Sequence, residues 1–165
     1  MRTETKTIKI YNFDELSEDV KRKLIEKEIE EQHEIYINDF LEYDMKEKAN
    51  ELLQKYFKNN KATLKNVYYE LSYCQGDGAM FEFDLYYYNK HVQIKHSGYY
   101  YHMYSFTIDT WELTEKQENQ LKEKVLKMFE EFEEYGWGLV DYRITEAEAI
   151  EYLQENEYLE DGTIY

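Results

Sequence analysis

Five residues whose side chains could bind a metal ion or take part in catalysis lie in the middle of the sequence. They are Cys74, Asp77, His91, His96 and His102. Such groups can bind zinc, and a cysteine beside a histidine can act as a nucleophile. However, His91 and His96 are five residues apart, so a strand would point them to opposite faces, and no CxxC, HxH or HExxH pattern is present. We predict no metal site and no catalytic residue, although a role for Cys74 beside one of these histidines stays geometrically open.

The stretch Gln75-Gly76-Asp77-Gly78 invites comparison with a phosphate-binding loop. Such a loop brings backbone N–H groups to a phosphate at the start of a helix. Here strand-like alternation lies on both sides, and no GK[ST] follows. A hairpin turn, with Gly76 and Gly78 at positive φ and Asp77 capping the backbone, explains all four residues. We therefore predict a turn and no nucleotide cofactor.

The segment that contains these residues alternates with a period of two from about Thr63 to Thr110. Turn residues at 75–78, 89–90 and 97–98 divide it, and the last run carries Tyr100, His102, Tyr104, Phe106 and Ile108. The pattern predicts an antiparallel meander of about four or five strands, formed mainly by residues 64–110.

Helical patterns lie on both sides of this meander. A short strand at 7–11 precedes a helix capped by Ser17, and a second helix is predicted at about 35–58. Thr114 and Thr145 each open a capping box, with a loop or short strand at 135–142 between these two helices. We predict a single α+β domain over residues 1–165, with its helices packed on one face of the sheet.

The net charge of −16 is concentrated toward the end of the sequence. Residues 130–165 hold 12 acidic residues and one basic residue, a net charge of −11. Nucleic acid is therefore an unsuitable direct ligand, and a basic protein surface is favoured. An equally open alternative is that the excess of acidic residues only keeps the chain in solution. The candidate partner-binding acids are Glu130, Glu131, Glu133 and Glu134 near the end of one helix, and Glu148, Glu151 and Glu155 along one stripe of the next.

Tyrosine dominates the aromatic residues, with 19 of them in the chain. Tyr99, Tyr101 and Met103, with Tyr86 and Tyr88, alternate with predicted core positions. On the opposite sheet face they would form either a surface covered by helices or a protein-binding patch.

Cysteine usage and hydropathy predict the compartment. The single cysteine excludes an intramolecular disulfide, no apolar run approaches a membrane span, and no signal peptide is evident. We predict a cytoplasmic protein with no membrane partner.

Three segments, IYNFDELSEDVKRKLIE, YELSYCQGDGAMFEF and NEYLEDGTIY, resemble a family of small phage and prophage proteins. That family has an F-x-E-L-S helix start and a Q-G-D-G-A hairpin followed by an aromatic strand, and some members carry an antitoxin-like label. The resemblance implies a mobile-element origin and supplies no catalytic residues.

A phage origin implies the cytoplasm of a bacterial host and would give the charge a function, because small acidic phage proteins often occupy the basic grooves of host nucleic-acid enzymes. The leading hypothesis is an inhibitor of a host nucleic-acid-directed defence system, similar to an anti-CRISPR protein. The alternatives are an antitoxin-like module that neutralises a toxin and, third, a small hydrolase or nucleotide-binding enzyme.

Overall fold

The computed structural model describes residues 7–165, which pack as two compact units. Unit 1 combines the described residues up to Asp39 with residues 142–165, and unit 2 is the continuous stretch 40–141. Each unit is described by itself.

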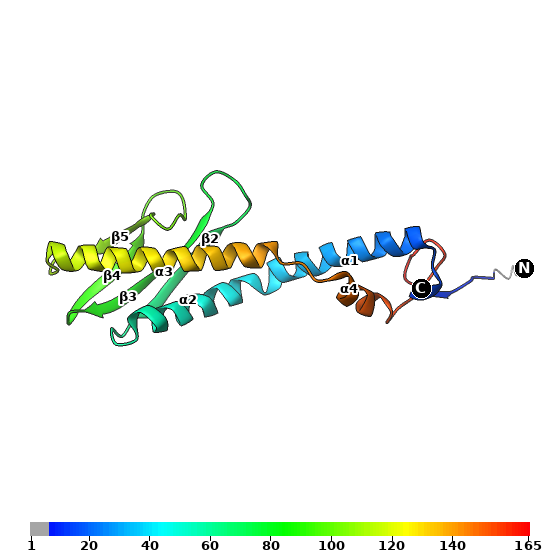
Figure 1. Cartoon of the computed structure of the whole chain (residues 1–165), viewed down its shortest axis with the longest axis horizontal. Helices are drawn as coiled ribbons and strands as arrows, with labels where there is room; N and C mark the ends of the chain where they lie inside the picture. Colours follow the sequence, from blue (N-terminus) through cyan, green and yellow to red (C-terminus); the bar gives the residue numbers. More distant parts are fainter. Residues whose placement is uncertain (1–6) are drawn as a thin grey trace, which may run out of the picture. The chain divides into compact units, whose positions relative to one another are not determined.

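Unit 2 is built on one antiparallel sheet with the strand order β2-β3-β4-β5 (Figure 1). The strands are β2 (Thr63–Glu70), β3 (Gly78–Tyr87), β4 (Lys90–His96) and β5 (Phe106–Asp109). Tyr88 and Asn89 join β3 to β4 with φ values of 50° and 62°, the two-residue turn whose twist suits a tight hairpin. The predicted meander of about four or five strands is confirmed, and it has four strands.

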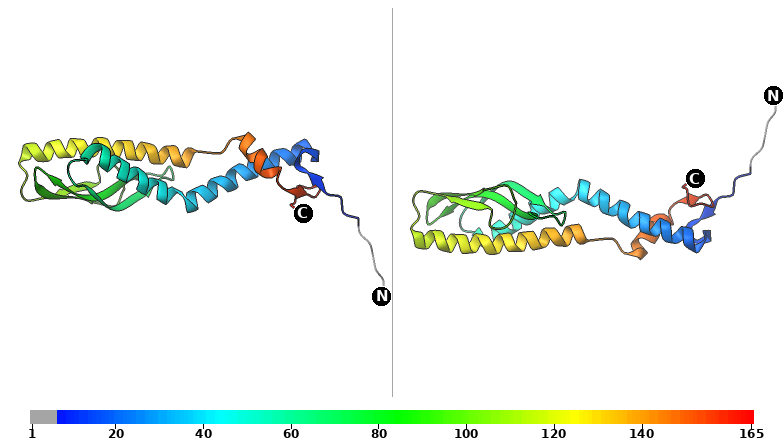
Figure 2. Two further views of the ribbon diagram at one scale, coloured as in Figure 1. Left: turned by 90° about the horizontal axis from the view of Figure 1, so that it is seen from below. Right: turned by 90° about the horizontal axis from the view of Figure 1, so that it is seen from above.

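Two helices, α2 (Leu41–Phe57) and α3 (Glu115–Asp141), cover one face of this sheet (Figure 2). Alternate side chains of β3 point at them. The Phe81 ring centroid lies 5.1 Å from that of Phe129 on α3, and the Phe83 centroid lies 5.6 Å from that of Phe57 on α2. The predicted α+β fold, with helices on one sheet face, is therefore present in unit 2.

The helix predicted at 35–58 begins later than expected. Helix α1 (Glu18–Asp39) continues through residue 39, and α2 starts at Leu41. Phe40 was expected on the apolar stripe but is 54 % exposed, whereas Phe57 is buried. The buried stripe therefore begins at Leu41, so Phe40 falls outside it.

The loop or short strand expected at 135–142 is wrong, because α3 continues to Asp141. Gly136 is buried there, and a Cβ at this position would lie 2.9 Å from Leu71 Cδ1 and 3.1 Å from Met45 Cε. This glycine therefore serves close packing of the helix rather than a turn.

The predicted strand through Tyr100 and Tyr104 is also wrong, because residues 97–105 form a loop and only Phe106–Asp109 pair with β4. Gly78 is not at positive φ either. It begins β3 beside the backbone of this loop, where a Cβ would lie 2.8 Å from Tyr101 O. Gly76, at φ +104°, is left-handed as predicted.

Unit 1 brings together both ends of the described chain. Strand β1 (Tyr11–Asn12) pairs antiparallel with β6 (Glu157–Tyr158), and the short 3-10 helix η1 (Phe13–Glu15) leads toward α1. Helix α4 (Glu146–Leu153) packs against α1. The core of the unit is Phe13, Leu16, Leu153 and Tyr158. The predicted strand at 7–11 is reduced to its last residue plus Asn12, because β6 offers only two residues for pairing.

The other three predicted helix starts are confirmed. Helix α1 begins directly after Ser17. Thr114 N donates to Gln117 Oε1 at 3.1 Å, and Thr145 N donates to Glu148 Oε2 at 2.8 Å, so both capping boxes form. Within the described residues, no helix has the length and apolar character required to cross a membrane.

Candidate interaction surfaces

Asp77 organises the connection between β2 and β3. Its carboxylate accepts hydrogen bonds from Ser72 N and Cys74 N, both at 2.7 Å, and from Ser72 Oγ at 3.2 Å. Asp77 is 8 % exposed, and the backbone N–H groups it binds belong to the same connection. The predicted turn is confirmed, and the carboxylate has a structural task there.

The cysteine and the histidines of the central segment have separate environments. Cys74 is exposed, His91 Nε2 lies 3.7 Å from Asp84 Oδ2, and His96 Nε2 lies 3.0 Å from Tyr100 O. The His102 ring packs against the Tyr100 ring at 5.9 Å. In residues 7–165, no three His, Cys, Asp or Glu side chains come together as a possible metal site.

A polar network that the sequence did not predict covers the open face of the sheet. Glu82 Oε2 accepts hydrogen bonds from Asn66 Nδ2 at 2.7 Å and Tyr68 OH at 3.0 Å, and Oε1 accepts from His96 N at 3.0 Å. Partial burial raises the pKa of Glu82, but these hydrogen bonds outweigh it and leave the pKa lowered. A carboxylate so fully bonded is held ionised and is poorly suited to accept a substrate proton.

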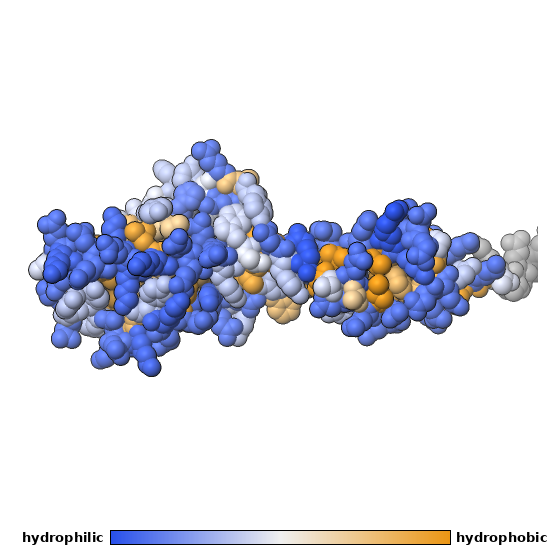
Figure 3. Space-filling view, viewed as in Figure 1, coloured by the Kyte–Doolittle hydropathy of each residue, from blue (hydrophilic) through white to orange (hydrophobic). Residues whose placement is uncertain are grey.

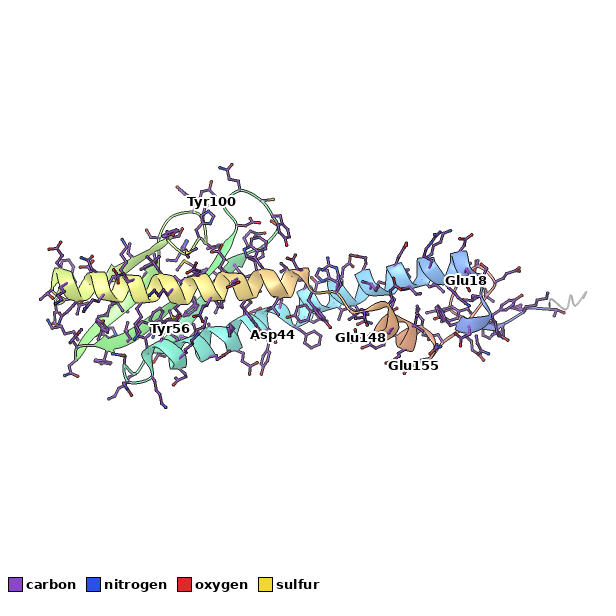
Figure 4. The ribbon with its side chains drawn as sticks, viewed as in Figure 1. Glu18, Asp44, Tyr56, Tyr100, Glu148 and Glu155 are labelled. Carbon is purple, nitrogen blue, oxygen red and sulfur yellow. The ribbon has the colours of Figure 1, made fainter. Side chains whose placement is uncertain are left out.

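The four candidate glutamates on α3 have three different environments. Glu131 Oε2 binds Lys55 Nζ at 2.7 Å, and Glu131 Oε1 accepts a hydrogen bond from Tyr56, which lies on α2 (Figure 4). Glu133 is half-buried, and its Oε2 is buried without a hydrogen-bond partner in the described chain. Only Glu130 and Glu134 are exposed. The position near a helix end that the sequence predicted for these residues is wrong, because α3 continues to Asp141.

The second group of candidate acids is exposed on unit 1. Glu148 and Glu155 lie toward opposite ends of α4 (Figure 4), with Glu151 between them in sequence. Glu155 follows the helix, which ends at Leu153, so the predicted stripe extends past the helix. Hydrogen bonds from Thr145 N and its hydroxyl lower the pKa of Glu148.

The three candidate aromatic-face residues share the loop 97–105 but have different environments. Tyr99 is 96 % exposed, whereas Tyr101 and Met103 are half-buried. The Tyr101 ring stacks on that of Tyr68 at 5.5 Å, above the open face of the sheet. Sequence reasoning missed Tyr73, which lies in the neighbouring connection and is 70 % exposed.

Comparison of the chain with protein-family models, with curated proteins and with solved structures finds no match. The resemblance to small phage proteins therefore stays a prediction.

Proposed function

We propose that this chain is an acidic protein-binding module that competes with nucleic acid for a basic surface of a partner protein. One observation carries the proposal: the seven acidic side chains of residues 142–165 are all exposed, and none forms an ion pair within the described part of the chain. These acids are Glu146, Glu148, Glu151, Glu155, Glu157, Glu160 and Asp161. The single basic residue of this segment, Arg143, lies 3.8 Å from Glu30.

Helices α1 and α2 pair several of their charges internally. On α1, Lys21 binds Glu18 at 3.1 Å and Lys27 binds Glu31 at 3.0 Å, and on α2 Lys48 binds Glu51 at 2.9 Å. The acids of residues 142–165 have no such internal partners among residues 7–165, so their charge is available to a partner surface. Unpaired carboxylates attract a cationic surface over a distance set by the ionic strength.

A groove in unit 1 favours a protein as the partner. It has a volume of about 470 Å³ and is lined partly by carboxylate residues and partly by Leu24, Leu153 and Ile164. A nucleic acid would be repelled from such a groove, whereas a basic side chain with an aliphatic stem suits both kinds of lining.

The predicted phage origin directs the choice of partner to nucleases of host defence in the bacterial cytoplasm. The test measures DNA binding by a panel of guide-RNA-loaded CRISPR nucleases and restriction nucleases, with and without the protein. We expect one member to lose DNA binding, and we expect this inhibition to weaken as salt is added.

Two double variants with the same change in charge identify the surface. Glu151→Lys with Glu155→Lys should raise the Kd for the nuclease about tenfold or more, which corresponds to about 1.4 kcal/mol. Glu130→Lys with Glu134→Lys, on exposed positions of α3, is the matched control and should have a smaller effect. Equal effects would show that total charge, not the segment 142–165, governs binding. Inhibition of no nuclease, together with capture of a small toxin, would replace this function with the antitoxin-like one.

A further inference from the structure

Two connections of unit 2 meet at one end of the sheet and present tyrosine side chains to solvent. The first is residues 71–77 between β2 and β3, and the second is residues 97–105 between β4 and β5. Tyr73, Tyr99, Tyr100 and Tyr104 are 70 %, 96 %, 54 % and 70 % exposed, and we call these four residues the tyrosine tip. In the space-filling view the projecting loops are mostly pale, which marks intermediate hydropathy (Figure 3).

We propose that the tyrosine tip is a second binding surface, and that it binds arginine side chains on the basic surface of a partner protein. The inference rests on the proposed function, because it assumes a cationic protein partner and adds the group that is recognised. It concerns a different part of the chain from the acids of residues 142–165.

The composition of the second loop is typical of protein recognition. Residues 97–105 read SGYYYHMYS, with four tyrosines, two serines and one glycine. Loops of this composition form the binding surfaces of antibodies, because tyrosine offers a large amphipathic contact area with only two side-chain torsions to restrict. In this protein the loop 97–105 is carried by the four-stranded sheet, as recognition loops are commonly carried by a scaffold of regular structure.

The loop 97–105 is held in place by its own contacts. Ser97 N donates to Ser105 O at 2.8 Å and closes its base. The Tyr101 ring packs between those of Tyr68 and His96, at 5.5 Å and 5.2 Å. Because these contacts fix the backbone, little conformational entropy is lost when the exposed rings bind a partner.

Tyr100 and Tyr73 join the two loops to each other and to α3. A Cβ on Gly76 would lie 2.3 Å from Tyr100 Cδ1, so the Tyr100 ring lies directly against this glycine, and Figure 4 shows Tyr100 at the projecting end. Tyr73 packs its ring 4.6 Å from that of Trp137, and its hydroxyl donates to Asp141. The tip is therefore a preformed surface made from both loops.

The charge around the tip selects the partner. Residues 71–78 and 97–105 contain no lysine or arginine, and Asp141 lies beside Tyr73. Exposed tyrosine rings attract cations through their faces, and arginine is preferred to lysine because its planar guanidinium also stacks on the ring. Single-stranded nucleic acid could stack on the same rings, but the chain's charge of −16 opposes it.

The test compares an oligoarginine peptide with an oligolysine peptide of equal length and charge. Trp137 reports binding through its fluorescence, because its ring contacts Tyr73. Trp111, which is 97 % exposed, is replaced by phenylalanine to leave one tryptophan. We expect the full-length protein to bind oligoarginine about fivefold more tightly than oligolysine.

Tyrosine variants assign that preference to the tip. Tyr99→Ala with Tyr104→Ala should abolish the preference for oligoarginine, and Tyr99→Phe with Tyr104→Phe should keep it, because the rings remain. The control, Tyr43→Ala, removes another exposed tyrosine of unit 2 and should leave the preference unchanged.

The outcome separates this inference from the proposed function. Equal affinity of the full-length protein for the two peptides, or an unchanged preference in the Tyr99/Tyr104 alanine variant, overturns the tyrosine tip alone. If the proposed function is wrong, a different result is expected. Glu151→Lys with Glu155→Lys would leave the affinity for both peptides and for the nuclease unchanged.

Discussion

Asp77 shows how one acidic residue can make a loop look like a site. Its carboxylate binds two backbone N–H groups of its own connection and the Ser72 hydroxyl. Because buried donors without an acceptor are costly, this residue specifies the loop that carries Tyr73. Sequence reasoning identified the turn correctly, since Gly76 and Asp77 have local preferences that need no knowledge of the rest of the fold.

Glu131 is a candidate acid whose charge is already paired within the chain. Lys55 and Tyr56 both donate to its carboxylate, and these hydrogen bonds lower the pKa of Glu131. Burial, followed by the hydrogen bond to Glu131, raises the pKa of Tyr56 to about 12. The sequence could not show this, because Glu131 and its partners are 75 residues or more apart.

Glu131→Gln should make the stability of the protein less dependent on acid pH. A carboxylate whose folded pKa is lowered stabilises the folded state above its unfolded pKa of about 4.3, and this contribution is lost as the pH falls through the folded pKa. At neutral pH we expect the variant to lose about 1 kcal/mol, because the pair is partly exposed and screened by solvent.

Urea unfolding followed by circular dichroism at neutral and acid pH measures this effect. The difference between wild type and Glu131→Gln should shrink as the pH falls, while Glu130→Gln, at an exposed position, should show no such trend. A difference that stays constant across the pH range contradicts the assignment.

At the scale of elements, local signals predicted the starts of helices better than their continuation. The capping boxes at Thr114 and Thr145 are correct because the residues that form them are three apart. The end of α3 was missed because Gly136 and Gly138 weaken a helix locally, whereas contacts from α2 and residue 71 hold it. The loop 97–105 was missed because its alternating tyrosines also fit the pattern of a strand. Strand β5 is short because only residues 106–109 pair with β4.

The two glycines of α3 should respond oppositely to alanine. Gly138→Ala should stabilise unit 2 by about 0.5–1 kcal/mol, because alanine favours the helix and a Cβ there meets nothing within 4 Å. Gly136→Ala should destabilise it by about 1 kcal/mol or more, since the new methyl group crowds the buried Met45 and the Leu71 side chain. Urea unfolding of the two variants in parallel checks the order, and greater stability of Gly136→Ala would show that this packing is loose.

At the scale of the whole molecule, the chain packs as two compact units that differ in their excess of acidic residues, whereas the sequence predicted one domain. The described residues of unit 1 include 17 acidic and 6 basic residues, and unit 2 has 18 and 12. The excess of acid is therefore greater in the smaller unit, which two distant segments build together. Periodicity could not reveal this division, because the contact between α1 and α4 spans more than a hundred residues. One domain over the whole chain stays a prediction.

Residues 40–141 expressed alone should fold. This stretch is continuous and contains the whole four-stranded sheet, both covering helices and a buried core that includes Phe81, Phe129 and Phe132. We expect cooperative urea unfolding of the fragment by circular dichroism. Residues 142–165 alone should be unfolded, because the partners of Leu153 and Tyr158 in the core, Phe13 and Leu16, are missing. A gradual transition for residues 40–141 would show that this unit depends on unit 1.

The pairing of β1 with β6 has a consequence for the order of events on the ribosome. Tyr11 and Asn12 are synthesised early, yet their partners Tyr158 and Glu157 are synthesised 145 residues or more later. Until those residues emerge, Phe13 and Leu16 lack their core partners and remain available to chaperones and proteases. Translation that halts after residue 141 would release a chain with a complete sheet but an unprotected beginning. In such a chain α4 and β6 would be missing, so Phe13 and Leu16 would stay exposed and proteases could reach them.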